Sequence, residues 1–427
     1  MLIQLIPFIV LVMILIKLEW GMIAFILYFF ILPLKVIFVG GLMLPYNTFF
    51  LAMILSFIIR YHNKDYYDFT PIRGLVILYV LLLLVIPIEF EMPISMQIKF
   101  WASDFLPSLV VPFVIWNIIV NKPVYFKIYS FTLLLAIIVA VVYGLILTQT
   151  YGLNPYLMYI LQLSGGEFNQ SYAAGADAGR LFGRISSVYQ HPMTFALVLS
   201  LSFIYVFFLK FNKIAKSFYL LAISMIIIMC GVRTPIVVVM LCLSIYVLTQ
   251  DFKLGFKIFL GLFVVFMLVS LVFPTVGDYV MSLFSSKGNV SGSSLSLRIE
   301  QFQGCIDIIK GNPFLGNGYR WPNYYMMLHG DHPVVLAFES LIFVIFCSWG
   351  FYGCLVWGLS FWSLSLNSIR KYKKDSIPII LIIISYLSYS VITGEYMYMQ
   401  YFVIFYILIY SKLYLNTKSK ILCQNRE

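Results

Sequence analysis

Arginines and histidines that could act on a phosphate-bearing substrate stand out in a chain of which only 11% of the residues are charged. The polar stretch 295–339 carries Arg298 at the start of an amphipathic segment and His329 and His332 near its end. A guanidinium can bind a phosphate through a bidentate, charge-assisted pair. A histidine accepts a proton near neutral pH. The stretch therefore predicts either an anion site with a nearby base or, for Arg298, an ordinary contact with a lipid headgroup.

The two histidines of this stretch form the pattern His-Gly-Asp-His. A metal site is one interpretation, but no third or fourth ligand lies near them in the sequence, and Gly330 makes the stretch too flexible for a helical ligand pair. A catalytic base is the better interpretation, with Asp331 orienting one of the rings. We expect no metal and no cofactor.

A further arginine, Arg233, occupies the tip of a short apolar hairpin, in the sequence Gly-Val-Arg-Thr-Pro. An arginine there has little water around it unless a polar cavity opens at the tip. The alternative is a side chain that extends to the membrane interface. The aromatic residues Trp321, Tyr324 and Tyr325 could stack on sugar faces or belong to an interfacial aromatic belt.

The elements that must position these residues are membrane spans. The 427 residues are 62% hydrophobic, with a mean hydropathy of +0.97, and no soluble domain of this length is so poor in charge. Apolar runs of about 17 to 22 residues recur, each near the length of a membrane-spanning helix. We predict an all-α, polytopic integral membrane protein with about 12 spans, or 13 if the N-terminal region contributes three.

The net charge of +11 does not indicate nucleic acid, because the basic residues are spread through short loops, as the positive-inside rule predicts. The N-terminus lacks the basic region and cleavage site of a signal peptide, so the first span should remain. The six cysteines form no pattern of a disulfide framework or a metal cluster.

Charge asymmetry predicts the arrangement of the loops across a single integral membrane domain, residues 1–427. The basic loops around residues 60–73 and 370–374 are expected inside, and two long polar loops, 148–190 and 274–333, outside. The second outer loop should carry a surface helix over residues 295–310, because its apolar residues follow a three- and four-residue spacing. The long apolar run after it, 334–366, should begin with a half-buried helix that carries Glu339.

Several motifs resemble those of the O-antigen polymerase (Wzy) and O-antigen ligase superfamily. They are RLFGRISSVYQHP in the first outer loop, GVRTP at the hairpin tip, and LRIEQFQGCIDIIKGNPFLGNGY followed by a histidine and an acidic residue. The resemblance covers roughly residues 175 to 410. One departure is His332-Pro333, where the family often has His-Asn.

The resemblance implies a GT-C-like glycosyltransferase of the bacterial inner (cytoplasmic) membrane, working at its outer face on undecaprenyl-diphosphate-linked glycans. It assigns three arginines to the donor diphosphate: Arg184, Arg233 and Arg298. It assigns His332 to the acceptor hydroxyl, as base or contact, with His329 in reserve. Arg180 and Tyr324 are further candidates for substrate binding, and Glu339 for catalysis.

The resulting prediction is a metal-independent polysaccharide polymerase that joins lipid-linked repeat units. An O-antigen ligase that transfers glycan to lipid A core would use the same donor chemistry. A flippase or transporter for lipid-linked sugars is the rival from another class, but the sequence shows no repeated halves. Expected partners are the lipid-linked glycan, membrane lipids, a chain-length regulator and a flippase, and no nucleic acid.

Overall fold

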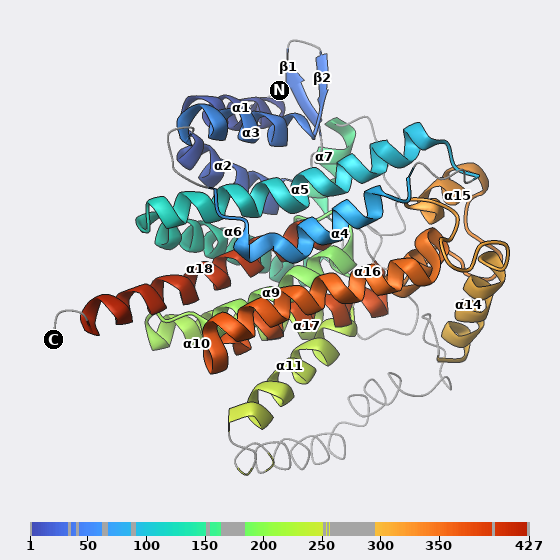
Figure 1. Ribbon diagram of the computed structural model, residues 1–427. Helices are drawn as coiled ribbons and strands as arrows, with labels where there is room; N and C mark the ends of the chain where they lie inside the picture. The colour runs from blue at the N-terminus through green and yellow to red at the C-terminus, as the bar shows by residue number, and fades with distance from the viewer. Residues whose placement is uncertain are drawn as a thin grey trace.

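Helices lying side by side make up most of the protein (Figure 1). The computed structural model describes residues 2–32, 36–39, 42–61, 67–86, 91–150, 154–163, 184–250, 253, 256, 295–394 and 398–424. The predicted span over 258–273 and the loop residues 164–183, with Arg180, lie outside this part of the chain.

The N-terminal region contains three short helices and a small hairpin. The helices are α1 (Leu2–Ile16), α2 (Leu18–Ile31) and α3 (Thr48–Tyr61), and strands β1 (Val36–Val39) and β2 (Leu42–Pro45) pair antiparallel. The all-α prediction missed this hairpin, because apolar strands of four residues do not differ in hydropathy from the neighbouring helices.

The remaining elements form the main helical body. In chain order they are η1 (Thr70–Ile72), α4 (Arg73–Leu83), α5 (Ile94–Asn121), α6 (Val124–Gln149), α7 (Pro155–Leu163), α9 (Pro192–Phe208), α10 (Lys213–Met229), α11 (Thr234–Gln250), α14 (Leu295–Ile308), α15 (Trp321–His329), α16 (Leu341–Tyr372), η2 (Lys373–Ser376), α17 (Ile377–Thr393) and α18 (Tyr398–Gln424).

Four helical runs in the described residues are long and apolar enough to cross a membrane: Ile94–Asn121, Val124–Gln149, Leu341–Thr393 and Tyr398–Ser419. The third joins α16 and α17 through η2. Six apolar helices of 10–17 residues accompany them. The structure thus supports a helical membrane protein, while the predicted count of about 12 spans is not reached among the described helices.

Helix α18 forms the centre of the body. Residues 402–411 of this helix are buried on every side, as expected of a helix that other helices enclose. It packs against α5, α6, α9 and α17. The Tyr406 hydroxyl donates a hydrogen bond to the Pro71 carbonyl oxygen at 2.7 Å, which ties α18 to the start of α4.

The two ends of the body differ in chemistry. The C-terminus of the chain and the basic residues around the α16–α17 connection lie at one end, and α14 and α15 lie at the other (Figure 1). We call the end with α14 and α15 the loop end. The positive-inside rule would place the basic end in the cytoplasm and the loop end outside.

Helix α16 is broken at Gly350, where φ is 56° and ψ is −145°. The segment 313–318 docks into the break. The backbone N–H groups of Phe351 and Tyr352 donate to the carbonyl oxygens of Pro313 and Phe314 at 3.1 and 2.9 Å. At the break, backbone N–H groups of α16 that would otherwise bond within the helix therefore bond to the segment 313–318.

The same docking uses the glycines of the loop. The N–H groups of Asn317 and Gly318 donate to the carbonyl oxygens of Cys347 and Ser348. A Cβ on Gly316 would lie 2.6 Å from the α16 backbone, so this position requires glycine. Segment 313–318 is therefore a structural element that fixes the loop end to α16.

The segment before α16 differs from the sequence prediction. Residues 330–340 form turns and a bridge between His332 and Leu336, and α16 starts only at Leu341. Glu339 therefore lies in the irregular segment before α16 and not in a half-buried helix. The Ser340 hydroxyl caps α16 by accepting a hydrogen bond from the Ile342 N–H, which is a common helix start.

Candidate functional site at the loop end

Three of the predicted arginines come together around the C-terminal end of α17. Arg298 reaches this end directly, because its Nη2 donates to the Ile392 carbonyl oxygen at 3.1 Å. Arg184 precedes α9 and Arg233 precedes α11, and both helices pack against α17. The start of α9 lies beside the C-terminal part of α17, because the Tyr389 hydroxyl donates to the Met193 carbonyl oxygen. These residues come from three separate parts of the chain, so only the packing of the helices assembles them.

Arg184 and Arg233 are joined through the backbone. Ile185 N–H donates to the carbonyl oxygen of Cys230 at 3.1 Å, and Cys230 lies three residues before Arg233 at the tip between α10 and α11. Asn154 fixes the Arg184 segment from the other side, because its buried amide donates to the Ser187 carbonyl oxygen at 2.6 Å. Both arginines are half-buried.

Arg298 projects from α14 toward the turn before α16. Its Nη1 donates to the Glu339 carbonyl oxygen at 2.6 Å, and the Glu339 carboxylate lies 3.8 Å from Nη2. The guanidinium also lies over the Phe343 ring, 5.9 Å from its centre. The Arg298 side chain is 23% exposed and that of Glu339 41% exposed. The ion pair is therefore long and partly open to solvent, and an incoming phosphate can replace the carboxylate.

His191 belongs to the same cluster, although the sequence analysis left it out of the site. It is the N-cap of α9, where its Nδ1 accepts from the Met193 N–H at 3.1 Å. Burial, followed by the positive charge of Arg184, lowers the pKa of His191 to about 4. The Tyr389 hydroxyl of α17 donates to the Met193 carbonyl oxygen at 2.7 Å. The sequence does contain a signal for this contact: His191 lies only seven residues after Arg184 and directly before Pro192, which begins α9.

His332 lies in the loop after α15 and organises that loop. Its Nδ1 accepts from the N–H groups of Val334 and Val335 at 3.2 and 3.1 Å. Burial lowers the pKa of His332 below its ordinary value, so the ring is neutral near pH 7. Because Nδ1 is an acceptor, the neutral ring carries its proton on Nε2 and presents a donor. In this state His332 can hold a hydroxyl oxygen but cannot accept its proton through Nε2.

The other aromatic candidates surround His332. The ring of Tyr325 lies 5.3 Å from that of His332 and 4.9 Å from that of His329. His329 is the last residue of α15 and is exposed. Tyr324 is partly buried against the small hydrophobic cluster under α14 and α15, and Trp321 donates from Nε1 to the Glu91 carboxylate at 3.3 Å.

His329 and His332 form a second group, apart from the arginines and His191, in the described structure. They are connected by the loop 332–339, which begins at His332 and ends at Glu339, the partner of Arg298. Gln301, one turn after Arg298 on α14, donates to the Val335 carbonyl oxygen of this loop at 3.4 Å. A displacement of the loop 332–339 would therefore move both His332 and the Glu339 partner of Arg298.

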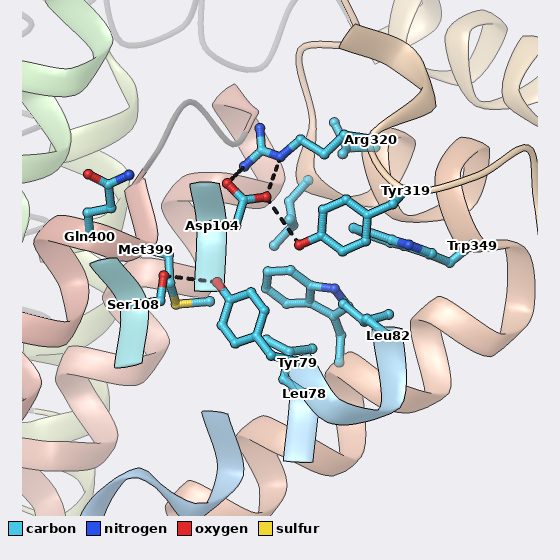
Figure 2. A pocket seen from close by; sticks show the side chains of 13 residues that line it. Leu78, Tyr79, Leu82, Asp104, Ser108, Tyr319, Arg320, Trp349, Met399 and Gln400 are labelled. Atoms are coloured by element: carbon cyan, nitrogen blue, oxygen red, sulfur yellow. Dashed lines mark hydrogen bonds and ion pairs between the residues drawn. The ribbon is translucent and has the colours of Figure 1, made fainter. Parts of the chain in front are cut away.

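A largely apolar pocket with an ion pair in its wall lies on the other side of the α16 start, and no pattern in the sequence had indicated it (Figure 2). Asp104 of α5 accepts two hydrogen bonds from Arg320, from Nε at 2.7 Å and from Nη2 at 3.0 Å, and a third from the Tyr319 hydroxyl at 3.1 Å. The ion pair is mostly buried, with the two side chains 15% and 13% exposed. Asp104 gave no signal because its partners lie more than 200 residues away.

This pocket has the mixed lining typical of sites for small polar ligands. Besides the ion pair it is lined by Trp349, Trp357 and Gln400. The indole N–H groups of both tryptophans are buried and have no hydrogen-bond partner among the residues that the structure describes. Leu341, the first residue of α16, also lines the pocket, so the segment 339–341 separates it from Arg298.

No group of three or more His, Cys, Asp or Glu side chains that could hold a metal ion occurs among the described residues. Metal independence stays a prediction, because the loop residues 164–183 and 257–294 are outside that part of the chain.

Comparison with known proteins supports the family resemblance. Residues 218–358 match the family described as O-antigen ligase, a segment of about one third of the chain that contains Arg233, Arg298, His332 and Glu339. No curated protein matches the chain. This match, over a segment that holds most of the loop-end site, supports the resemblance of the chain to the O-antigen polymerase and ligase superfamily.

Proposed function

We propose that this protein is a membrane glycosyltransferase that joins undecaprenyl-diphosphate-linked oligosaccharide repeat units into a surface polysaccharide. The observation that carries the proposal is the convergence of Arg184, Arg233 and Arg298 on one end of α17. The family match supports an enzyme of the polymerase or ligase type. Multi-pass insertion in the bacterial inner membrane, with the loop end outside, is part of the proposal.

The proposed reaction is the displacement of a lipid diphosphate. A hydroxyl oxygen of the acceptor sugar forms a bond to the anomeric carbon of the donor sugar, and the bond from that carbon to the diphosphate oxygen breaks. Negative charge develops on the departing diphosphate, where each arginine could contribute about 2 to 4 kcal/mol of stabilisation. This charge would be stabilised without a metal ion.

The proton of the attacking hydroxyl needs an acceptor close to the donor. Glu339 fits this role, because its carboxylate is 41% exposed and lies 3.8 Å from Arg298. A phosphate that replaces the carboxylate on Arg298 would leave Glu339 beside the reacting carbon. His332 would then orient the acceptor through its Nε2–H, with Tyr324 and the exposed His329 nearby on α15.

A ligase that transfers glycan to lipid A core remains the second candidate, because the matched family is described as O-antigen ligase. The donor site would be the same in both enzymes, and only the acceptor would differ. No comparison supports a flippase. The proposed partners are the lipid-linked glycan and membrane lipids, with a chain-length regulator and a flippase acting on the same glycan.

The test is the purified protein in liposomes with lipid-linked repeat units, with glycan length read from a gel. Arg298→Ala should lower the rate by about 10²- to 10³-fold, the scale expected when one preorganised donor to a developing charge is lost. Arg298→Lys keeps the charge but loses the planar fork, so activity retained in this variant would indicate that charge alone is needed. Adding lipid A core as acceptor distinguishes ligase from polymerase by the product.

Lys310→Ala is the matched control. Lys310 is a cation on the same loop end, but its side chain is 73% exposed and pairs only with the exposed Asp307 three residues away. This variant should keep normal activity. Normal activity of Arg298→Ala would remove Arg298 from the site, and activity abolished by EDTA would contradict the metal-free mechanism.

A further inference from the structure

Two buried cysteines meet at the contact between α14 and α16. Cys305 of α14 and Cys347 of α16 are both fully buried, and both belong to the small hydrophobic cluster formed by α14, α15 and the start of α16. The Cys305 thiol lies close enough to that of Cys347 to affect its ionisation, at the place where α14 packs against α16. Both are reduced in the structure.

The surroundings bring the two helices close at this point. Next to Cys305, Gly304 allows the close approach of the loop, because a Cβ there would lie 2.9 Å from Val334 Cγ1. The Cys347 carbonyl oxygen accepts from the Asn317 N–H, which fixes the backbone of Cys347 within the loop end. Contacts therefore hold the chain next to both cysteines: the loop packs on Gly304, and Asn317 binds the Cys347 carbonyl oxygen.

We propose that Cys305 and Cys347 form a disulfide bond that cross-links α14 to α16. The inference depends on the outward orientation of the loop end, where disulfides form and persist, and not on the proposed glycosyl transfer. The reaction is thiol–disulfide exchange with a disulfide-bearing thiol oxidant outside the membrane. The two cysteine thiols lose two protons and two electrons and form one S–S bond, and the oxidant's disulfide is reduced to two thiols.

The order of events follows from burial. An oxidant cannot reach two thiols that are fully buried, so the bond forms before α14 packs against α16. Once formed, it is shielded from reductants by the same packing. The bond closes a loop that contains the docked segment 313–318 and the whole of α15.

The disulfide bond would affect the candidate site by fixing the position of α14. Cys305 lies seven residues after Arg298, which is close to two helical turns, so both side chains project from the same face. Buried Gln301 lies between them on this face. Fixing Cys305 to α16 therefore fixes the face that presents Arg298 to Glu339.

The test counts free thiols in the full-length protein. Cells are lysed in a denaturant that contains a small maleimide, so that every reduced thiol is exposed and blocked. The excess is removed, and the protein is then reduced and reacted with a maleimide-linked polyethylene glycol, which adds mass at every cysteine that had been oxidised. With six cysteines in the chain, the wild type should gain two polymer groups. Cys305→Ser and Cys347→Ser should each gain none, and Cys242→Ser, which removes a buried cysteine of α11, should still gain two.

A wild type that gains no polymer group would overturn the proposal. Two groups retained in Cys305→Ser would also overturn it, because the bond would then join other cysteines. Since the wild type alone gives the first result, the test does not depend on how the variants fold. Reductant present during heating should lower the apparent thermal midpoint of the wild type, because the bond becomes accessible as the protein unfolds. It should leave that of Cys305→Ser unchanged, because only the wild type has a cross-link to lose.

Discussion

At the scale of single residues, His332 shows that a side chain can be in the predicted place with a different hydrogen-bonding role. Its Nδ1 is engaged by two N–H groups of its own loop. The sequence analysis treated it as a base or an acceptor contact, and the geometry favours the contact. In the proposed mechanism, proton acceptance then falls to Glu339, the acidic candidate at the end of the same loop.

A substitution that preserves the loop tests this division of roles. His332→Asn keeps an acceptor near the Nδ1 position but loses the Nε2–H, so we expect a normal thermal midpoint and a clear loss of polymerisation rate. Glu339→Gln should cost about 10²- to 10⁴-fold in rate, the usual scale for general base catalysis. The measurement is the initial rate of the reconstituted enzyme.

The comparison with His329→Ala decides between the histidines. If His329→Ala is inactive while His332→Asn keeps its rate, the acceptor contact belongs to His329. A Glu339→Gln enzyme with the wild-type rate would return the role of base to a histidine.

His191 gives a prediction about pH. Its pKa is lowered to about 4 in the folded protein by burial and by Arg184, whereas an unfolded histidine titrates near 6.5. Between these values the unfolded state binds the proton and the folded state does not, so stability falls as the pH is lowered from about 6.5 toward 4. The stabilising contribution is fully present above about pH 6.5.

The measurement is the thermal midpoint in detergent across pH 4 to 8. His191→Asn keeps an N-cap acceptor for the Met193 N–H but does not titrate, so its midpoint should fall less steeply at low pH. His329→Gln, at the exposed end of α15, serves as the control and should follow the wild type. Equal pH dependence of His191→Asn and the wild type would contradict the assignment.

At the scale of elements, the break in α16 is the feature that positions the loop end. Gly350 adopts a backbone conformation that is essentially reserved for glycine. A Cβ there would also lie 2.2 Å from the Pro313 carbonyl oxygen. The docking of segment 313–318 therefore depends on this one position.

Gly350→Ala should destabilise the protein by about 1 to 3 kcal/mol from backbone strain alone, with a further cost from the clash. Gly358→Ala is a control on the same helix, because nothing lies within 4 Å of a Cβ at that position. It should be neutral or slightly stabilising. The measurement is the thermal midpoint of both variants, and a larger loss in Gly358→Ala would show that the break is not needed.

At the scale of the whole molecule, the chemical difference between the two ends implies an orientation in the membrane. Cysteine introduced at Lys310 on the loop end should react with a membrane-impermeant maleimide in intact cells. Cysteine at Lys374, in the basic η2 connection, should react only after the membrane is opened. Both positions are exposed, so reversed labelling would overturn the orientation, and with it the assignment of the loop end to the outer face.

The sequence alone determined the class of protein and selected several candidate site residues. Hydropathy and the distribution of basic residues are local properties, and they predicted a helical membrane protein with its basic loops on one side. Motif resemblance selected Arg233 and Arg298, which lie in the segment that the family match covers. The three- and four-residue spacing predicted the helix that begins at Leu295.

Only the tertiary structure decided which of these residues act together. The Arg184 segment meets the tip that carries Arg233, because the Ile185 N–H donates to the Cys230 carbonyl oxygen, and Arg298 reaches α17 nearly one hundred positions away in the chain. The pair of Asp104 and Arg320 is separated by 216 residues. Such contacts depend on how helices pack, and helical periodicity indicates which face is buried but not which distant helix covers it.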